Sequence, residues 1–226
     1  NQDEALKYHE KALEINKAID GKHHPSIAST YNKIGDVYFY GKNYTKAKEY
    51  YQKCFEIRRS VLGDEHSDTG LCYRNFGKIS YERKDYKEAI ESYEKALFIR
   101  LKNHGPNHFT NAFPLHQLAG LYEILLDYAK AEKYFLDALD IREITLKNKN
   151  PDDPKFVESC HDLGESYHDL GMLYYKLGKH QKAVEFVTKA EEIRKKNFGD
   201  ENPLTIESRK KFGKDTSLKP ANNGRE

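Results

Sequence analysis

GKNYTKAKEYYQKCFEIR, residues 41–58, decides the fold, because the chain repeats its pattern at a fixed interval. The stretch RKDYKEAIESYEKALFIR follows 42 residues later, at 83–100, and LLDYAKAEKYFLDALDIR follows after the same interval, at 125–142. A period between about 20 and 50 residues indicates a protein that is built of structural repeats rather than of one globular core.

Several columns of like residues keep this period. An isoleucine recurs near the end of each stretch, and two columns of small residues stand upstream of it. A tyrosine column and a third column of small residues stand further upstream. Small residues seven apart lie on nearly the same face of a helix, which predicts a recurring packing face. The members are Ile15, Ile57, Ile99 and Ile141; Ala5, Ala47, Ala89 and Ala131; Ala12, Cys54, Ala96 and Ala138; Gly35, Gly77 and Ala119; and Tyr44, Tyr86 and Tyr128.

Each repeat is predicted to hold two helices. The first, such as 25–40, begins at a proline, whose missing N–H costs nothing in the first turn. The second, such as 44–62, follows a tight turn and ends at a glycine that is expected to cap it in the left-handed conformation. Small residues are expected to let the two backbones approach, with aromatic rings of the neighbouring repeat filling the remaining space. The capping glycines are Gly21, Gly63, Gly105 and Gly199.

The composition argues against several classes of protein. The 226 residues carry 38 basic and 36 acidic side chains and a formal charge of +2, which argues against a nucleic-acid surface. No apolar run approaches the ~20 residues that cross a bilayer, so membrane insertion is not expected. The three cysteines are odd in number and lack the spacing of metal ligands, which favours a reduced, cytoplasmic setting.

The residues of one helix pair carry a resemblance to a known family. Loops of the form Gly-x-x-His, with Pro after it at 21–25, join successive pairs. By these features the sequence resembles tetratricopeptide repeats over about residues 2–213, in the 42-residue form found in kinesin light chains. The resemblance implies an all-α fold, a right-handed superhelical solenoid of helix-turn-helix repeats. The signature residues are Ile34, Gly35, Tyr38, Gly41, Tyr44, Ala47 and Cys54.

The period also predicts how the chain is divided. Residues 1–24 are expected to be the second helix of a truncated leading repeat, and 214–226, which have no apolar period, a disordered tail. Residues 203–213 are expected to form a capping helix. The repeats between them are 25–66, 67–108, 109–153 and 154–202, the last with a lengthened first helix.

The resemblance implies that the first helices line a concave groove in which an extended peptide or a partner helix binds. Helical spacing around the glycine column nominates the residues of this groove. Arg74 and Lys78 stand one turn apart near Tyr81, which favours an acidic or aromatic-acidic peptide. The nominated residues are Asn32, Asp36, Phe39, Leu71, Arg74, Lys78, Tyr81, Phe113, His116, Glu123, Glu165, His168, Met172 and Tyr175. The light chains usually carry a paired asparagine where this chain has only Asn32.

The word HDLGESY at 161–167 is followed by a near copy, HDLGMLY, at 168–174. Ile193 stands 52 residues after Ile141, so ten residues have been added, and the copy is taken to supply seven of them. The first helix, 154–177, is then expected to project a spur of ~10.5 Å, and deleting 161–167 should restore the regular spacing. The spur has three interpretations: a metal site at His161 and His168 without an evident third ligand, a docking ridge, or a neutral lengthening.

The remaining motifs do not indicate catalysis. His24, His66 and His108 recur in the connecting loops, which suggests a shared loop hydrogen bond. No nucleophile elbow, phosphate loop or paired metal motif is present, so neither an enzyme nor a cofactor or metal is predicted. The predicted function is a protein-interaction module within a larger scaffold or adaptor. Two alternatives stay open: an accessory recognition domain of an enzyme whose catalytic part lies outside this chain, and self-association through the end helices.

Overall fold

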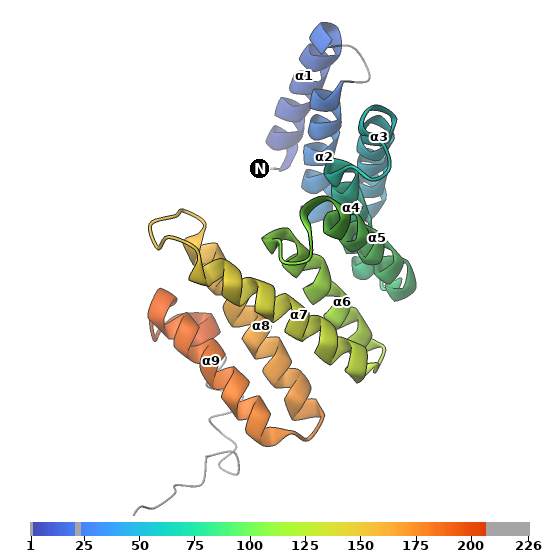
Figure 1. Ribbon diagram of the computed structural model, residues 1–226. Helices are drawn as coiled ribbons and strands as arrows, with labels where there is room; N and C mark the ends of the chain where they lie inside the picture. The colour runs from blue at the N-terminus through green and yellow to red at the C-terminus, as the bar shows by residue number, and fades with distance from the viewer. Residues whose placement is uncertain (1, 21–23, 207–226) are drawn as a thin grey trace, which may run out of the picture. The chain divides into compact units, whose positions relative to one another are not determined.

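The computed structural model describes residues 2–20 and 24–206, which form helices and no strand (Figure 1). The helices fall into two compact units, Asn1–Pro106 and Asn107–Glu226. The first unit contains α1 (Gln2–Asp20), α2 (Pro25–Tyr40), α3 (Tyr44–Leu62), α4 (Ser67–Glu82) and α5 (Tyr86–His104). The second contains η1 (Phe109–Asn111), α6 (Ala112–Ile124), α7 (Tyr128–Lys147), α8 (Phe156–Lys176) and α9 (His180–Phe198). The prediction of an all-α helical-repeat solenoid is confirmed.

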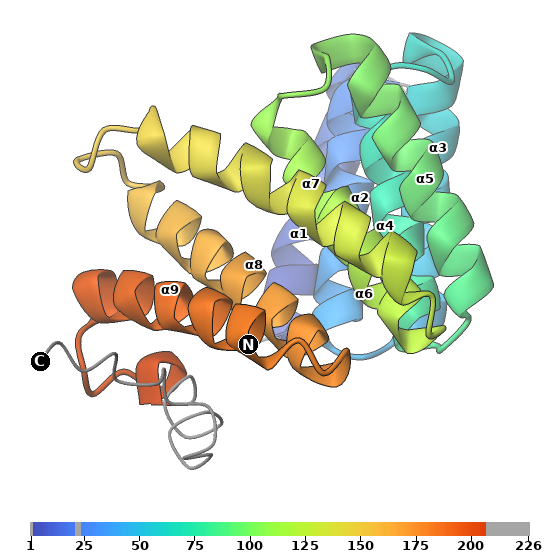
Figure 2. The same cartoon turned by 60° about the horizontal axis from the view of Figure 1, so that its bottom comes forward.

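Neighbouring helices pack as antiparallel pairs. In the first unit α2 pairs with α3 and α4 with α5, and α1 packs against α2. In the second unit α6 pairs with α7 and α8 with α9, as Figure 2 shows for α8 and α9. The two predicted helices of a repeat, 25–40 and 44–62, have the bounds of α2 and α3.

The glycine column lets the two helices of one pair approach closely. A Cβ atom at Gly35 would lie 2.6 Å from the ring of Tyr51, and one at Gly77 would lie 3.1 Å from the ring of Tyr93. Each ring therefore fills the space that the missing side chain leaves. Each of these rings belongs to the second helix of the same pair. A ring of the neighbouring repeat also contributes, as expected, since Phe76 of α4 packs against the buried cluster of Ala47 and Tyr51.

The helix ends confirm part of the predicted cap. Gly63, Gly105 and Gly199 have φ of 90°, 78° and 87°, the positive values that favour glycine. Their ψ values, between 169° and 173°, are those of an extended chain, so the predicted left-handed helical cap is wrong. The chain has to leave each second helix in an extended direction to reach the next first helix. Gly21 lies outside the described residues.

The recurring loop histidines cap the helices that follow them. His24, His66 and His108 each accept a hydrogen bond at Nδ1 from the backbone N–H two residues later, at 3.3, 3.1 and 3.4 Å. This bond satisfies one of the N–H groups that a helix start leaves without a partner. The predicted shared loop hydrogen bond is confirmed.

The ten added residues of the last repeat lie before the repeated word, not within it. Pro25 and Ser67, the first residues of α2 and α4, stand ten residues before Gly35 and Gly77. His161 stands ten residues before Gly171, so both copies of the word occupy the normal length of a first helix. The additions are four of the eight residues of the loop 148–155, the first turn and a half of α8 at 156–160, and one residue of α7.

The prediction that the repeated word forms a spur is therefore wrong, since α8 is lengthened at 156–160 instead, and the packing gives the physical reason. Leu163, Ser166 and Tyr167, in the first copy of the word, are buried. Gly164 belongs to a small-residue column seven positions before the Gly35 column, where the other repeats have Ala28, Gly70 and Ala112. A Cβ at Gly164 would meet the Arg194 side chain at 3.3 Å. The apparent duplication is the seven-residue packing period of every first helix, visible here because both small residues are glycine.

The isoleucine column is exposed in α1 and buried in the later helices. Ile15 is 57% exposed, whereas Ile57, Ile99 and Ile141 of the same column are buried. Tyr8 and Ile19 of α1 are exposed as well.

At the other end, residues 203–206 are helical, while the rest of the expected capping helix, 207–213, and the expected tail, 214–226, lie outside the described residues. The division into repeats stays a prediction.

Candidate functional site

The nominated groove residues lie in both units, and each set is held by its own contacts. In the first unit, Asn75 on α4 donates from Nδ2 to Oδ1 of Asn32 on α2 at 2.8 Å. Asn32 donates from Nδ2 to Oδ2 of Asp36 at 3.0 Å, and Tyr51 donates from its hydroxyl to Oδ1 of Asp36 at 2.7 Å. Burial and the hydrogen bond to Asp36 raise the pKa of Tyr51. This network fixes α2 against α4, and Asn75 was not nominated from the sequence.

A cation beside aromatic rings lies next to that network. The Nζ atom of Lys78 on α4 is 4.5 Å from the ring centre of Phe39 and 5.5 Å from that of Tyr40 on α2. Burial lowers the pKa of Lys78, and the nearby charge of Arg74 lowers it further. Two cations are thus held together at a partly buried place, an arrangement that an anionic group would stabilise.

The other nominated residues of the first unit border this cation pair. Leu71 is half-buried, and Tyr81 is 38% exposed, with its ring centre 6.2 Å from that of Tyr86. The first-unit surface, as defined here, consists of Phe39, Tyr40, Arg74, Lys78 and Tyr81.

In the second unit, the nominated residues His116, Glu165 and His168 belong to one network around the buried His116. His116 on α6 is 6% exposed, and its Nδ1 lies 3.3 Å from the guanidinium of Arg142 on α7. A guanidinium can only donate, so Nδ1 accepts and Nε2 carries the proton. Nε2 lies 3.2 Å from Oδ2 of Asp169 and 3.7 Å from Oε2 of Glu165, both on α8. Oδ1 of Asp169 lies 3.1 Å from Nδ1 of His168.

This cluster has the spacing of metal ligands but not the electrostatics. His116, Glu165 and Asp169 offer ligand atoms within 4.8 Å of one another, the one such group in residues 2–20 and 24–206. The predicted pair His161 and His168 is not part of it. The Arg142 guanidinium lies 3.8 Å from Glu165 and occupies the second nitrogen of His116. Because it already supplies the positive charge, we interpret the cluster as a hydrogen-bond network.

A column of arginines, which was not nominated from the sequence, links consecutive helix pairs. Arg58, Arg142 and Arg194 donate to the backbone oxygens of Asp68, Asp162 and Leu204 at 3.0, 2.8 and 3.3 Å. Each guanidinium reaches from the end of a second helix to the following helical segment, at its first turn for Asp68 and Leu204 and at the second turn of α8 for Asp162. The signal was present as the last letter of the stretches CFEIR and ALDIR, at the repeat period.

Asp169 makes the stability of the second unit dependent on pH. Burial opposes its charge, but hydrogen bonds from His116 and His168 hold the pKa of Asp169 well below its usual range. A carboxyl whose folded pKa is depressed contributes stability above its unfolded pKa of about 3.9 and loses it as the pH falls further. Asp169→Asn should therefore lower the melting temperature at pH 7, and the difference from the native chain should narrow below about pH 4.

Asp140→Asn, on the exposed side of α7, is the control for this measurement. Its melting temperature should follow the native value at each pH. A constant difference between Asp169→Asn and the native chain from pH 7 to pH 2.5 would contradict the assignment.

The other nominated residues of the second unit have separate contacts. Glu123 accepts a hydrogen bond from Lys176 at 2.6 Å, and the ring centre of Tyr175 lies 5.5 Å from that of His180. Phe113 and Met172 are half-buried. Their role in ligand binding stays a prediction.

Comparison with known families agrees with the repeat geometry. The model of the tetratricopeptide repeat matches residues 1–60, 26–102 and 80–144, and a second model of the same description matches 164–197. The chain belongs to the tetratricopeptide repeat family. The stretch between the matched ranges, 145–163, contains the added loop and the first turns of α8, where the spacing is irregular. Tetratricopeptide proteins are in general non-catalytic scaffolds for protein interactions.

Solved structures share this tetratricopeptide fold. BtubC (BKLC) from P. vanneervenii has a TM-score of 0.73 and 23% identity, over 85% of this chain and 73% of that one. A kinesin-light-chain protein of nearly identical TPR-like repeats from Podosopora anserina has a TM-score of 0.61 and 20% identity, over 87% and 89%. Aspartyl phosphate phosphatase F from Bacillus subtilis has a TM-score of 0.73 and 20% identity, over 90% and 48%. The repeats are thus of the kinesin-light-chain-like type.

No curated protein matches this tetratricopeptide chain. Among the helices that the structure describes, none is long and apolar enough to cross a membrane.

Proposed function

We propose that this tetratricopeptide chain is a protein-interaction module that binds an extended acidic or aromatic-acidic peptide on its first helices. The observation that carries the proposal is the Lys78 ammonium, held beside the rings of Phe39 and Tyr40 with the charge of Arg74 nearby. A carboxylate of the peptide would pair with the cations, and an aromatic side chain would pack on the exposed part of the rings. The nominated residues of the second unit are proposed to bind an extended peptide or a partner helix on that unit.

The burial of Lys78 supports an anionic ligand. A half-buried ammonium loses hydration, and a second cation nearby adds repulsion, so the charged form is disfavoured in the free protein. A bound carboxylate offsets both effects because it adds a negative charge beside Lys78, as Asp36 and Glu82 already do from within the chain. Charge-assisted hydrogen bonds of this kind contribute more than neutral ones, which favours acidic over uncharged peptides.

A fluorescent peptide tests this proposal. The chain contains no tryptophan, so the tryptophan of a Glu-Glu-Trp-Glu-Glu peptide can be excited selectively. We expect a blue shift of its emission on binding, and an affinity at least about tenfold weaker for the double variant Arg74→Glu and Lys78→Glu. Helical circular dichroism should stay unchanged.

The matched control is the double variant Lys84→Glu and Lys87→Glu, which replaces two exposed lysines of the same unit. It changes the net charge equally and should bind the acidic peptide nearly as well as the native chain. Equal affinities of the Arg74/Lys78 double variant and the native chain would contradict the proposal.

The wider role follows from the same proposal. A scaffold or adaptor in the cytoplasm would use this surface to hold a partner, whereas an accessory domain of an enzyme would use it to recognise a substrate or regulator. The full-length sequence distinguishes these two. Self-association through an end helix is a further proposal, supported by the exposed Tyr8, Ile15 and Ile19 of α1.

A further inference from the structure

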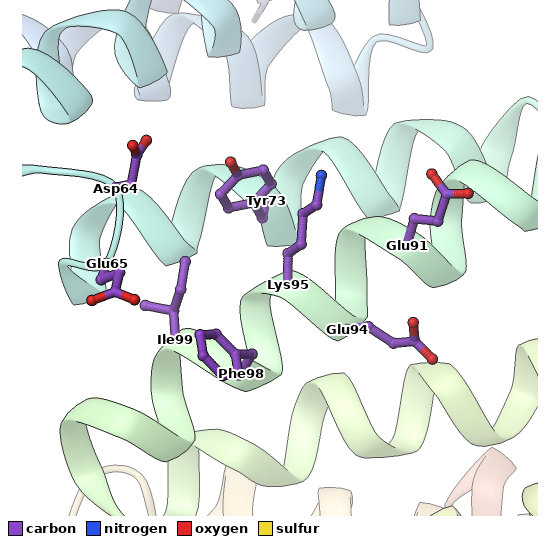
Figure 3. A pocket seen from close by; sticks show the side chains of 8 residues that line it. All are labelled: Asp64, Glu65, Tyr73, Glu91, Glu94, Lys95, Phe98 and Ile99. Carbon is purple, nitrogen blue, oxygen red and sulfur yellow. The ribbon is translucent and has the colours of Figure 1, made fainter.

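A pocket of about 530 Å³ lies in the first unit, over α5, α4 and the loop before α4. Figure 3 shows Phe98 and Lys95 of α5 in its middle, with Tyr73 of α4 beside them. No nominated groove residue lines it. Its volume is in the range of pockets that bind ligands, about 300–1,000 Å³.

Phe98 breaks a column that is otherwise acidic. The positions one or more repeats away hold Glu14, Glu56, Asp140 and Glu192. The fold therefore tolerates a carboxylate at this place and does not require an aromatic ring. Phe98 is nevertheless 59% exposed. An exposed ring where the repeat normally places a charge favours a binding role over a packing role.

The pocket has an apolar floor. Ile99 is buried beneath it, and the Nζ atom of Lys95 lies 5.5 Å from the ring centre of Tyr73. A partner's apolar side chain could therefore pack on Phe98 and Tyr73 and remove the Phe98 ring from water.

Carboxylates stand at both ends of the pocket. Figure 3 shows Asp64 and Glu65 at one end and Glu91 and Glu94 at the other. Asp64 forms an ion pair with Arg59 at 2.7 Å, and Glu65 forms one with Lys102. Against these four carboxylates the lining has one cation, Lys95. Because Asp64 and Glu65 are already paired within the chain, the complementary ligand is one that carries positive charge next to an apolar group, toward Glu91 and Glu94.

We propose that this pocket is a second peptide-binding site, which takes a basic segment of a partner protein. A bulky apolar side chain of the segment packs on Phe98 and Tyr73, and flanking lysines or arginines pair with Glu91 and Glu94. The site shares no residue with the first-unit surface, lies mainly on α5, and has the opposite sign of charge. It adds to the proposed function and does not depend on it.

The test uses a Lys-Lys-Trp-Lys-Lys peptide and the emission of its tryptophan. The native chain should shift this emission to the blue, and Phe98→Glu should weaken binding at least about tenfold. This substitution places the residue type of positions 14, 56 and 192 on the helix, so the fold should persist. Val157→Glu removes another exposed apolar side chain, 55% exposed, and should leave binding unchanged.

The charge requirement has its own variant. The double variant Glu91→Lys and Glu94→Lys should weaken binding of the basic peptide. Its helical content should stay unchanged, because both side chains are exposed. The Arg74/Lys78 double variant should keep its affinity for the basic peptide and lose affinity for the acidic peptide. Phe98→Glu should lose affinity for the basic peptide and keep it for the acidic one. Native affinity for the basic peptide in Phe98→Glu, or no binding by the native chain, would overturn this proposal and leave the acidic-peptide site unaffected.

Discussion

Arg142→Met is expected to reduce the free energy of unfolding of the second unit by about 3–5 kcal/mol, the usual cost of removing one partner from a buried ionic network. The Arg142 side chain is 7% exposed and donates to His116, Ser166 and the backbone oxygen of Asp162. Methionine fills similar space but donates nothing. It leaves these acceptors buried and the carboxylates of α8 without their cation.

Denaturant unfolding followed by circular dichroism measures this effect, and hydrogen exchange in α6, α7 and α8 locates it. Lys133→Met is the control, because Lys133 is exposed on the same helix. It should change stability by less than about 0.5 kcal/mol. A loss below about 1 kcal/mol in Arg142→Met would show that the network contributes little to the packing of α7 on α8.

The second large effect is expected from a single methyl group at a helix crossing. Gly171→Ala would place a Cβ 2.6 Å from Cγ2 of Val187 and 3.2 Å from the backbone oxygen of Ala183. The valine can turn, but the backbone contact can be relieved only if α8 and α9 move apart. We expect a loss of about 1–3 kcal/mol, the usual cost of overpacking.

Gly120→Ala is the matched control in the same unit. A Cβ there meets nothing within 4 Å, and alanine is the better helix former by about 1 kcal/mol. The same substitution should therefore stabilise the chain at position 120 and destabilise it at position 171, as thermal melts would show. Stabilisation by both substitutions would mean that α8 and α9 are not held at the described distance.

The period predicted the local structure well because each repeat contains its own signals. The start of α2 at Pro25 and the end of α3 at Leu62, before Gly63, follow from residues within the helix or next to it. The loop histidines act within two residues of themselves, so their role was also open to sequence reasoning.

The sequence does not show directly where the ten residues are added, because the small-residue column that includes Gly164 contains both alanine and glycine. Ala28 and Ala112 occupy its place in other repeats and do not look like Gly70 and Gly164. A repeated word was therefore taken for an insertion. Only the start of α8 at Phe156 shows that the helix was extended before the word.

The candidate sites required contacts between helices that a period cannot give. The sequence placed His116, Glu165 and His168 in one groove, but not the contact of His116 with Arg142 and Asp169. It grouped Arg74 with Lys78 but gave no distance from Lys78 to Phe39. Phe98 was visible in the stretch ALFIR, and comparison with the acidic residues of its column could have singled it out.

The most direct test of the central claim is a map of where the acidic peptide binds. Amide chemical shifts of the isotope-labelled chain are measured while the Glu-Glu-Trp-Glu-Glu peptide is added. We predict the largest changes within the first unit at the amides of Phe39, Arg74, Lys78 and Tyr81. Changes confined to α5, or no changes at saturating peptide, would contradict the claim that the first helices form the binding surface.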